Sequence, residues 1–298
     1  MISLLRDDDA GLPDDFLIAR IRGRRQARLS RLSGQRPSVT DSDLAGEEAI
    51  TRAFETEVRW LYRQTTGKTR MEVAPLFVLF ELRLLLNWLR QGHWHGEQHA
   101  HGFLGETLWH QSLPRQWAGL DADRDGRNIL AALEKRAAAR VPAFKGVSLA
   151  YQRHNLTEVE RRLTEAVLAH GAVSGKAPLR QGLCRALIDG CNVTALMKAW
   201  LWRAPAMPAV MPAGHLSAAQ LGRIWRGESV ARAGLPATAS KAAITAQQIA
   251  ALQAEQKKTI WRTVRPQAME FGPAAVVIDY LFFLEAEVVE RRGLLGLP

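Results

Sequence analysis

The apolar residues of this 298-residue chain recur every three or four positions, and this spacing constrains the fold more than any other feature. In the stretch 47–64, for example, Ile50, Phe54, Val58 and Leu61 fall on one stripe of a helix. No segment alternates polar and apolar residues convincingly, as a half-buried strand would. Aromatic residues make up only 7% of the chain, whereas the helix formers Ala, Leu, Arg and Glu are abundant. We therefore expect an all-α protein.

Proline, glycine and helix caps divide this pattern into separate helices. Three breaks stand out: LPRQWAGLDADRDGR, RAPAMPAVMPAGHL and GESVARAGLPATASKAAIT. They separate the chain into roughly three parts, so an internal repeat is worth testing. The helices that we expect run roughly over 12–32, 47–64, 72–91, 126–140, 155–170, 179–203, 216–226, 245–262 and 266–295.

Three acids inside apolar helices give a possible register for such a repeat. The stretches that begin at Glu81, Asp189 and Glu287 align without gaps, and the three acids lie 108 and 98 positions apart. Each acid precedes a run of helix formers. Asn192 follows Asp189 by three positions, so the two side chains share one helix face and form a polar spot that needs a partner.

Charge and tryptophan content suggest contact surfaces without identifying the partner. Forty Lys and Arg residues against thirty Asp and Glu give a net charge of +10, which favours nucleic acid, anionic lipid or an acidic protein surface. The first helix carries a basic face of Arg20, Arg24, Arg28 and Arg31, which is either a partner-contact surface or a solvated helix face. Trp200 and Trp202 cannot share a helix face, so one is expected in the core and the other against a neighbouring module or a partner.

Several classes of protein do not fit the sequence. The apolar segments are interrupted by charges and lack the roughly 20 uncharged residues of a membrane span, and we find no secretion signal. Cys184 and Cys191 lie too far apart along one helix for a disulfide, which fits a reducing cytoplasm. The phosphate-binding pattern GxxxxGK[ST] and the nucleophile motif GxSxG are both missing. We expect no enzyme activity, no small-molecule substrate and no cofactor.

Two segments resemble metal sites, but neither matches one fully. DADRDG, residues 121–126, matches the start of a calcium loop, yet Ala132 stands at the twelfth position where a bidentate Glu is needed. Asp125 is better explained as a cap for the helix that follows. The second segment is a loop that holds five histidines without any cysteine: His93, His95, His99, His101 and His110. We interpret it as a surface loop and expect no metal site.

The final stretch, YLFFLEAEVVERRGLL, resembles the C-terminal signature of the C subunit of archaeal and vacuolar-type rotary ATPases, called subunit d in eukaryotes. Glu287 and Arg292 match that signature, while Glu290 stands where Asn is usual. Ala213 replaces one glycine of the pair that begins a helix in the family. Four further segments are similar to the family in the same order: FLIARIRGRRQARL, NLTEVERRLTEAVLAH, LIDGCNVTALMKAWLWR and PAGHLSAAQLGRIW.

This resemblance implies one domain, 1–298, built as a pseudo-threefold funnel of three helical modules, approximately 12–115, 120–214 and 215–298. Such a subunit is a non-catalytic socket in the central stalk, which couples the c- or K-type membrane rotor ring to the D- and F-type shaft subunits during ion transport or ATP synthesis. It lies peripherally on the cytoplasmic face of the membrane.

On this interpretation the polar residues within helices join neighbouring modules. The proposed joint residues are Glu81, Asp189, Asn192, Glu287 and Arg292. The alternative is a basic helical nucleic-acid-binding protein that uses the arginines of the first helix, and its binding would depend strongly on salt.

Overall fold

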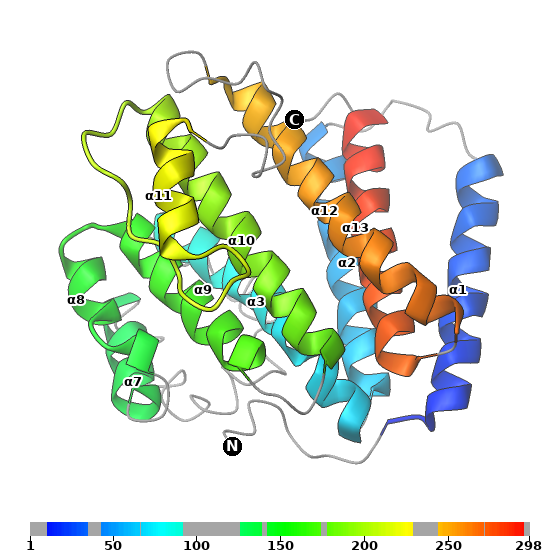
Figure 1. The fold of residues 1–298 in the computed structure, drawn as a ribbon. Coiled ribbons are helices and arrows are strands. Elements are labelled where there is room, and N and C mark those ends of the chain that lie inside the picture. The colour runs from blue at the N-terminus through cyan, green and yellow to red at the C-terminus, as the bar shows by residue number, and fades with distance from the viewer. Residues whose placement is uncertain are drawn as a thin grey trace. The chain divides into compact units, whose positions relative to one another are not determined.

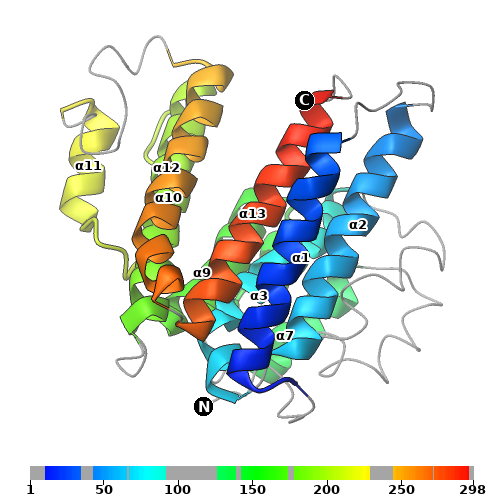
Figure 2. The ribbon, with the colours of Figure 1, turned by 90° about the vertical axis from the view of Figure 1, so that its right-hand side faces the viewer.

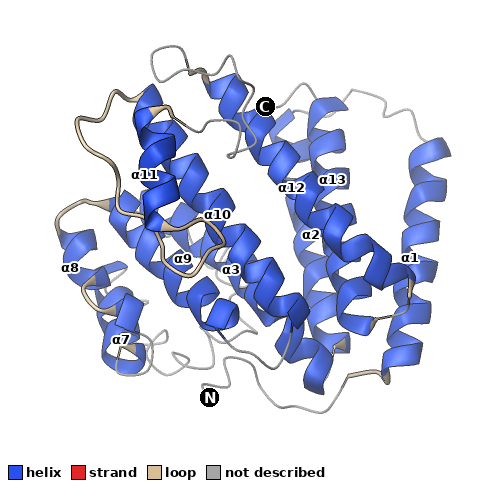
Figure 3. Ribbon diagram, viewed as in Figure 1, coloured by secondary structure: helices blue, strands red, loops and turns tan. Residues whose placement is uncertain are grey.

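A computed structural model describes residues 11–34, 43–65, 67–91, 126–138, 142–173, 178–228, 244–270 and 272–294. Within these ranges the chain forms helices and loops and contains no strand, so the expected all-α class is confirmed (Figure 1 and Figure 3). No helix among the described residues has both the length and the apolar character that crossing a bilayer requires.

The described helices are α1 Asp14–Gly34, α2 Asp43–Gln64, α3 Gly67–Gln91, α7 Gly126–Ala137, a short 3-10 helix Pro142–Phe144, α8 Val147–Gln152, α9 Leu156–Val173, α10 Pro178–Leu201, α11 Ala218–Arg226, α12 Ala246–Met269 and α13 Pro273–Leu294. All nine predicted helices are present among the described residues in the predicted order, and the short 3-10 helix and α8 were not predicted. The chain groups into two compact units, one of residues 1–81, 95–114 and 263–298, and the other of residues 82–94 and 115–262. The three-module funnel stays a prediction.

In the first unit, α13 packs against both α1 and α2, and the three helices lie side by side in Figure 2. Residues 274–281 of α13 are all buried, which explains why the first half of this helix is apolar on nearly every side, with Asp279 as its one charged residue. Its partner α1 is much less buried. α1 buries Leu17, Ile18 and Ile21 in its first half and no residue from 22 to 30. Within residues 14–30, apolar burial therefore holds α1 only at its beginning.

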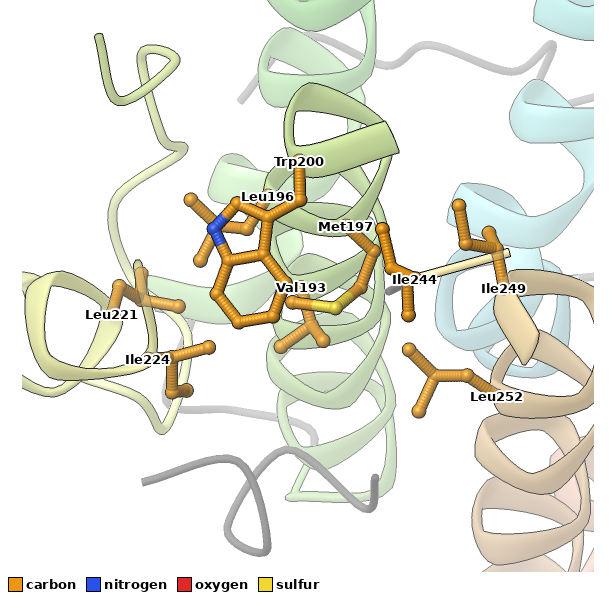
Figure 4. Packing of buried hydrophobic residues seen from close by; sticks show 9 residues of the cluster. All are labelled: Val193, Leu196, Met197, Trp200, Leu221, Ile224, Ile244, Ile249 and Leu252. Atoms are coloured by element: carbon orange, nitrogen blue, oxygen red, sulfur yellow. The ribbon is translucent and has the colours of Figure 1, made fainter. Parts of the chain in front are cut away.

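In the second unit, α10 is the central helix. It packs against α9, in which Val159, Leu163 and Ala166 are buried along one apolar stripe. The short helix α8 also packs against α9. The second half of α10 packs against α11 and the start of α12, as Figure 4 shows around Trp200. The members of this cluster are Val193, Leu196, Met197, Trp200, Leu221, Ile224, Ile244, Ile249 and Leu252.

The boundary between the last two helices differs from the expected one. We expected the first of these helices to end near 262 and the second to begin near 266. The structure continues α12 through Pro266 to Met269, and Pro273 is the residue that begins α13. The N–H of Gly272 donates to the C=O of Gln267 at 3.1 Å in the turn between them. The expected boundary was therefore placed several residues too early.

Candidate functional site

Asp189, near the middle of α10, binds the backbone just ahead of α11. Its Oδ2 accepts a hydrogen bond from the N–H of His215 at 2.9 Å, and its Oδ1 accepts one from the N–H of Leu216 at 3.0 Å. The next residue, Ser217, is the N-cap of α11. A carboxylate is favourable here, because backbone N–H groups at the start of a helix lack partners within the helix and carry partial positive charge.

Asn192 lies one turn further along the same face of α10 and binds the connector at a second point. Its Nδ2 donates to the C=O of Met211 at 2.8 Å, and its Oδ1 accepts from the N–H of Met211 at 2.7 Å. The Asn192 residue is only 2% exposed, and Met211 is buried as well. We call Asp189, Asn192 and the backbone groups that they bind the connector clamp, where the connector is the chain from 202 to 217.

Two adjacent small residues of the connector, Ala213 and Gly214, differ in how well they suit its path beside α10. A Cβ on Gly214 would overlap Oδ1 of Asp189, and it would also lie 3.0 Å from Asp189 Cγ and 3.2 Å from Ile188 Cγ2. Only glycine therefore allows the connector to pass so close to α10. Ala213 has φ +70°, in the left-handed region that glycine adopts easily and alanine does not. This is the position where the resembling family has a second glycine.

A second polar cluster, in the other unit, connects α1 to α2 and α13. Nη1 of Arg28 lies 2.8 Å from Oε2 of Glu287, and Nη2 of Arg28 lies 3.0 Å from Oε2 of Glu57. Arg24 also pairs with Glu57, and Arg25 pairs with Asp279. We call these six residues the ionic seam. Its three carboxylates are nearly buried, and the arginines that pair with them offset their negative charge.

Aromatic residues support the same contacts. The guanidinium carbon of Arg24 lies 4.0 Å from the ring centre of Trp60, and that of Arg25 lies 5.0 Å from the ring centre of Phe283. The hydroxyl of Tyr280 donates to Oε1 of Glu57 at 2.7 Å. Burial raises the pKa of Tyr280, and the hydrogen bond to Glu57 raises it further. Tyr280 is therefore a stable proton donor, and its role in the seam is structural.

The charge of Arg28 is favourable despite its partial burial. Burial opposes the charge of Arg28, but the hydrogen bond to Glu57 and the field of Glu287 outweigh it, so the pKa of Arg28 is raised. Arg291 approaches the other oxygen of Glu287 at 2.6 Å, as an ion pair without hydrogen-bond alignment. Glu287 thus has a cation at each of its oxygens.

The structure brings together several of the residues that the sequence singled out. Asp189 and Asn192 form the connector clamp, and Glu287 belongs to the ionic seam together with Arg24 and Arg28. Arg20 is exposed on α1, outside the seam. The remaining three lie in described helices, but their side chains fall outside the described part of the structure: Arg31, Glu81 and Arg292. The role of these residues as joints between modules stays a prediction.

Sequence reasoning missed four members of the site: Arg25, Glu57, Asp279 and the hydroxyl of Tyr280. The signal was present for the acids, because each stands next to buried apolar residues in a helix. Asp279 in particular interrupts the run AAVVIDYLFF. An acid in such a position needs a cation from another element, since burying it unpaired is costly.

Within the described part of the chain, no group of three or more His, Cys, Asp or Glu side chains is arranged to hold a metal ion. The five-histidine loop lies outside the described residues, as do positions 121–125 of the calcium-like segment. Burial raises the pKa of Cys184 to about 12, so this thiol is a poor nucleophile at neutral pH.

Comparison with known proteins adds no relative: no family model, no curated protein and no solved structure matches this chain.

Proposed function

We propose that this chain is a non-catalytic rotor subunit of an archaeal or vacuolar-type rotary ATPase, in which it acts as a socket between the membrane rotor ring and the central shaft. The observation that carries the proposal is the connector clamp. It joins two of the segments that resemble the family, LIDGCNVTALMKAWLWR and PAGHLSAAQLGRIW, through Asp189, Asn192 and the close approach of Gly214. The residues behind the resemblance are thus the residues that make the contact.

The two ends of the chain support the proposal in the same way. FLIARIRGRRQARL lies in α1 and YLFFLEAEVVERRGLL lies largely in α13, and the ionic seam connects them through Arg28 and Glu287. Glu287 is one of the positions that match the family's C-terminal signature. Four of the five resembling segments therefore take part in two defined contacts.

A socket that carries torque needs stiffness, and both clusters supply it. Close-packed helical interiors deform little. The clamp adds hydrogen bonds that fix an irregular connector to a helix, and the seam adds ion pairs where α1 has no buried apolar residues. Nucleotide chemistry would belong to other subunits, and this subunit would lie on the cytoplasmic face of the membrane.

The seam weighs against the alternative of nucleic-acid binding through α1. Arg24, Arg25 and Arg28 are already engaged by carboxylates of the same chain. Phosphates would have to displace those carboxylates, which would then be left nearly buried without a cation. Fewer arginines of α1 are therefore available to bind phosphates than the sequence implies.

The experiment that tests the proposal is affinity purification of the tagged chain from gently solubilised native membranes, washed at moderate salt, with the retained partners identified by mass spectrometry. Stable recovery of ring and shaft subunits is the expected result. An Asp189→Ala, Asn192→Ala double variant serves as the comparison, and we expect it to retain less of both partners. Recovery of nucleic acid without ring or shaft subunits would overturn the proposal.

A further inference from the structure

Trp202 and Arg203 end α10 in a motif that glycine normally completes. The N–H of Arg203 donates to the C=O of Trp200 at 3.0 Å, and the N–H of Ala204 donates to the C=O of Ala199 at 2.8 Å. These two bonds define a Schellman motif, in which one residue takes the left-handed conformation and is most often glycine. Here that residue is Arg203, with φ +54°. Arginine at this position carries a conformational cost that glycine would avoid.

Two other helices of the chain end with the same pair of bonds and provide a comparison. At the end of α11 the left-handed residue is Gly227, with φ +84°, which is the usual solution. At the end of α8 it is His154, with φ +56°. The motif can therefore form with or without glycine in this chain, and the arginine in α10 is not required by the helix end itself.

The neighbouring Trp202 is largely exposed. Its residue is 66% exposed, whereas Trp200 two positions earlier is 2% exposed and belongs to the core. Tryptophan is a residue that usually buries most of its surface. The sequence expectation that one of these tryptophans lies in the core is met by Trp200, and this leaves Trp202 for another contact.

The surroundings of this pair are cationic. The C-terminal ends of α10 and α11 lie together, because Nε1 of Trp200 donates to the C=O of Trp225 at 3.2 Å. Between positions 190 and 227 the sequence contains no Asp or Glu and four cations: Lys198, Arg203, Arg223 and Arg226. Arg226 pairs with Glu228, the first acid after this stretch. The surface therefore fits a partner that presents carboxylates.

A protein fits this surface better than a flexible polyanion or a lipid surface. The connector that follows Arg203 is fixed by the clamp, and a preformed surface reduces the entropy lost when a partner of fixed shape binds. Tryptophan and arginine are also the side chains that most often dominate protein interfaces. An arginine can in addition pair with a carboxylate through two parallel hydrogen bonds, which defines the orientation of the contact.

We infer that Trp202 and Arg203 form a contact point for a protein surface that presents carboxylates beside apolar side chains, and that in the rotor this surface belongs to the central shaft. The inference rests on the proposed function. The shaft is the fitting neighbour because torque must pass between two water-exposed protein surfaces, and an oriented arginine–carboxylate pair next to a packed tryptophan resists sliding.

The test uses the purified full-length chain and purified D- and F-type shaft subunits from the same source, with affinity measured by isothermal titration calorimetry. Trp202→Ala is expected to weaken binding at least roughly tenfold, as for an interface hot spot. Arg203→Gly is expected to weaken binding roughly tenfold while its melting temperature stays equal or rises. A purely structural role could not move stability and affinity in these opposite directions.

Matched controls separate this contact from general effects. Phe16→Ala removes another aromatic residue with the same 66% exposure, and His154→Gly relieves the same strain at the end of α8. Both controls should bind the shaft like the wild type. Wild-type binding that survives Trp202→Ala and Arg203→Gly would overturn the inference and leave the proposed function intact.

Other outcomes also decide the question. If the two variants lose binding only to the rotor ring, or only to vesicles that contain phosphatidylglycerol, the shaft is the wrong occupant. If the wild-type chain binds neither shaft nor ring, the proposed function fails together with the inference.

Discussion

Arg28 of α1 and Glu287 of α13 are separated by 259 positions in the chain, yet Nη1 of one lies 2.8 Å from Oε2 of the other. This ion pair connects the first described helix to the last. It does so within residues 22–30 of α1, which bury no apolar side chain, so the position of this stretch depends more on charge than on apolar contact.

Replacing Arg28 should therefore be costly. Arg28→Ala leaves Glu57 and Glu287 nearly buried without this cation, and we expect the free energy of unfolding to fall by about 3 kcal/mol. Arg20→Ala, an exposed position on the same helix, should change it by less than about 0.5 kcal/mol. Urea unfolding of both variants checks this. A double-mutant cycle with Glu287→Ala should give a coupling of roughly 1–3 kcal/mol, and strict additivity would contradict the pairing.

The clamp predicts a local effect at Asn192. Asn192→Ala removes both hydrogen bonds to Met211 and leaves a buried N–H and C=O without their partner, so we expect a loss of about 3 kcal/mol. The amide of Met211 should exchange with deuterium much faster in the variant. Asn155→Ala is the control, because Asn155 caps α9 at an exposed position and its loss should cost only about 1 kcal/mol. Unchanged exchange at Met211 would show that the clamp does not hold the connector.

Two adjacent substitutions in the connector should have opposite effects. Ala213→Gly relieves a left-handed alanine and should stabilise the protein by about 0.5–1 kcal/mol. Gly214→Ala places a Cβ against the Asp189 carboxylate and should destabilise it by about 2 kcal/mol or more. Thermal unfolding followed by circular dichroism measures both. Shifts of the same sign would mean that the connector follows a different path.

Glu134 predicts a dependence on pH. Its carboxylate accepts hydrogen bonds from the N–H of Gly146, and from the N–H and hydroxyl of Ser148 at 3.1 and 2.6 Å. Burial alone would raise the pKa of Glu134, but these bonds outweigh it, so the pKa is lowered. A lowered pKa means that ionised Glu134 stabilises the fold above the ordinary glutamate pKa, and that this stabilisation disappears as the pH falls through the folded value.

Glu134→Gln should accordingly lower the free energy of unfolding by roughly 1 kcal/mol at neutral pH, after allowance for partial exposure, and by much less in acid. Urea unfolding at pH 7 and at about pH 3 checks the difference between variant and wild type. Glu270→Gln, which removes an exposed carboxylate, should show no such change with pH. An equal loss at both pH values would contradict the role of the ionised form.

The sequence was sufficient to predict the long helices and to predict that Asp189 and Asn192 need a partner, because both follow from local spacing. It missed α8, which is too short to show a helical repeat of apolar residues. It could not identify Met211, His215 and Leu216 as that partner, since this contact depends on how the connector turns back onto α10. The arginines of α1 illustrate the same limit. Their helical positions were predictable, but their pairing with Glu57, Asp279 and Glu287 depends on the packing of distant helices.

The clamp also limits where residues can be added to or removed from the connector. Asp189 and Asn192 are one helical turn apart on α10, and the groups that they bind, at Met211 and at His215 and Leu216, must span the same rise of about 5 Å. An insertion or deletion in 212–214 would break one of the two attachments. Pro205 and Ala206 lie outside this constraint and are exposed, so that point of the connector is where a tag, a label or an inserted sequence would leave the attachment to α10 unchanged.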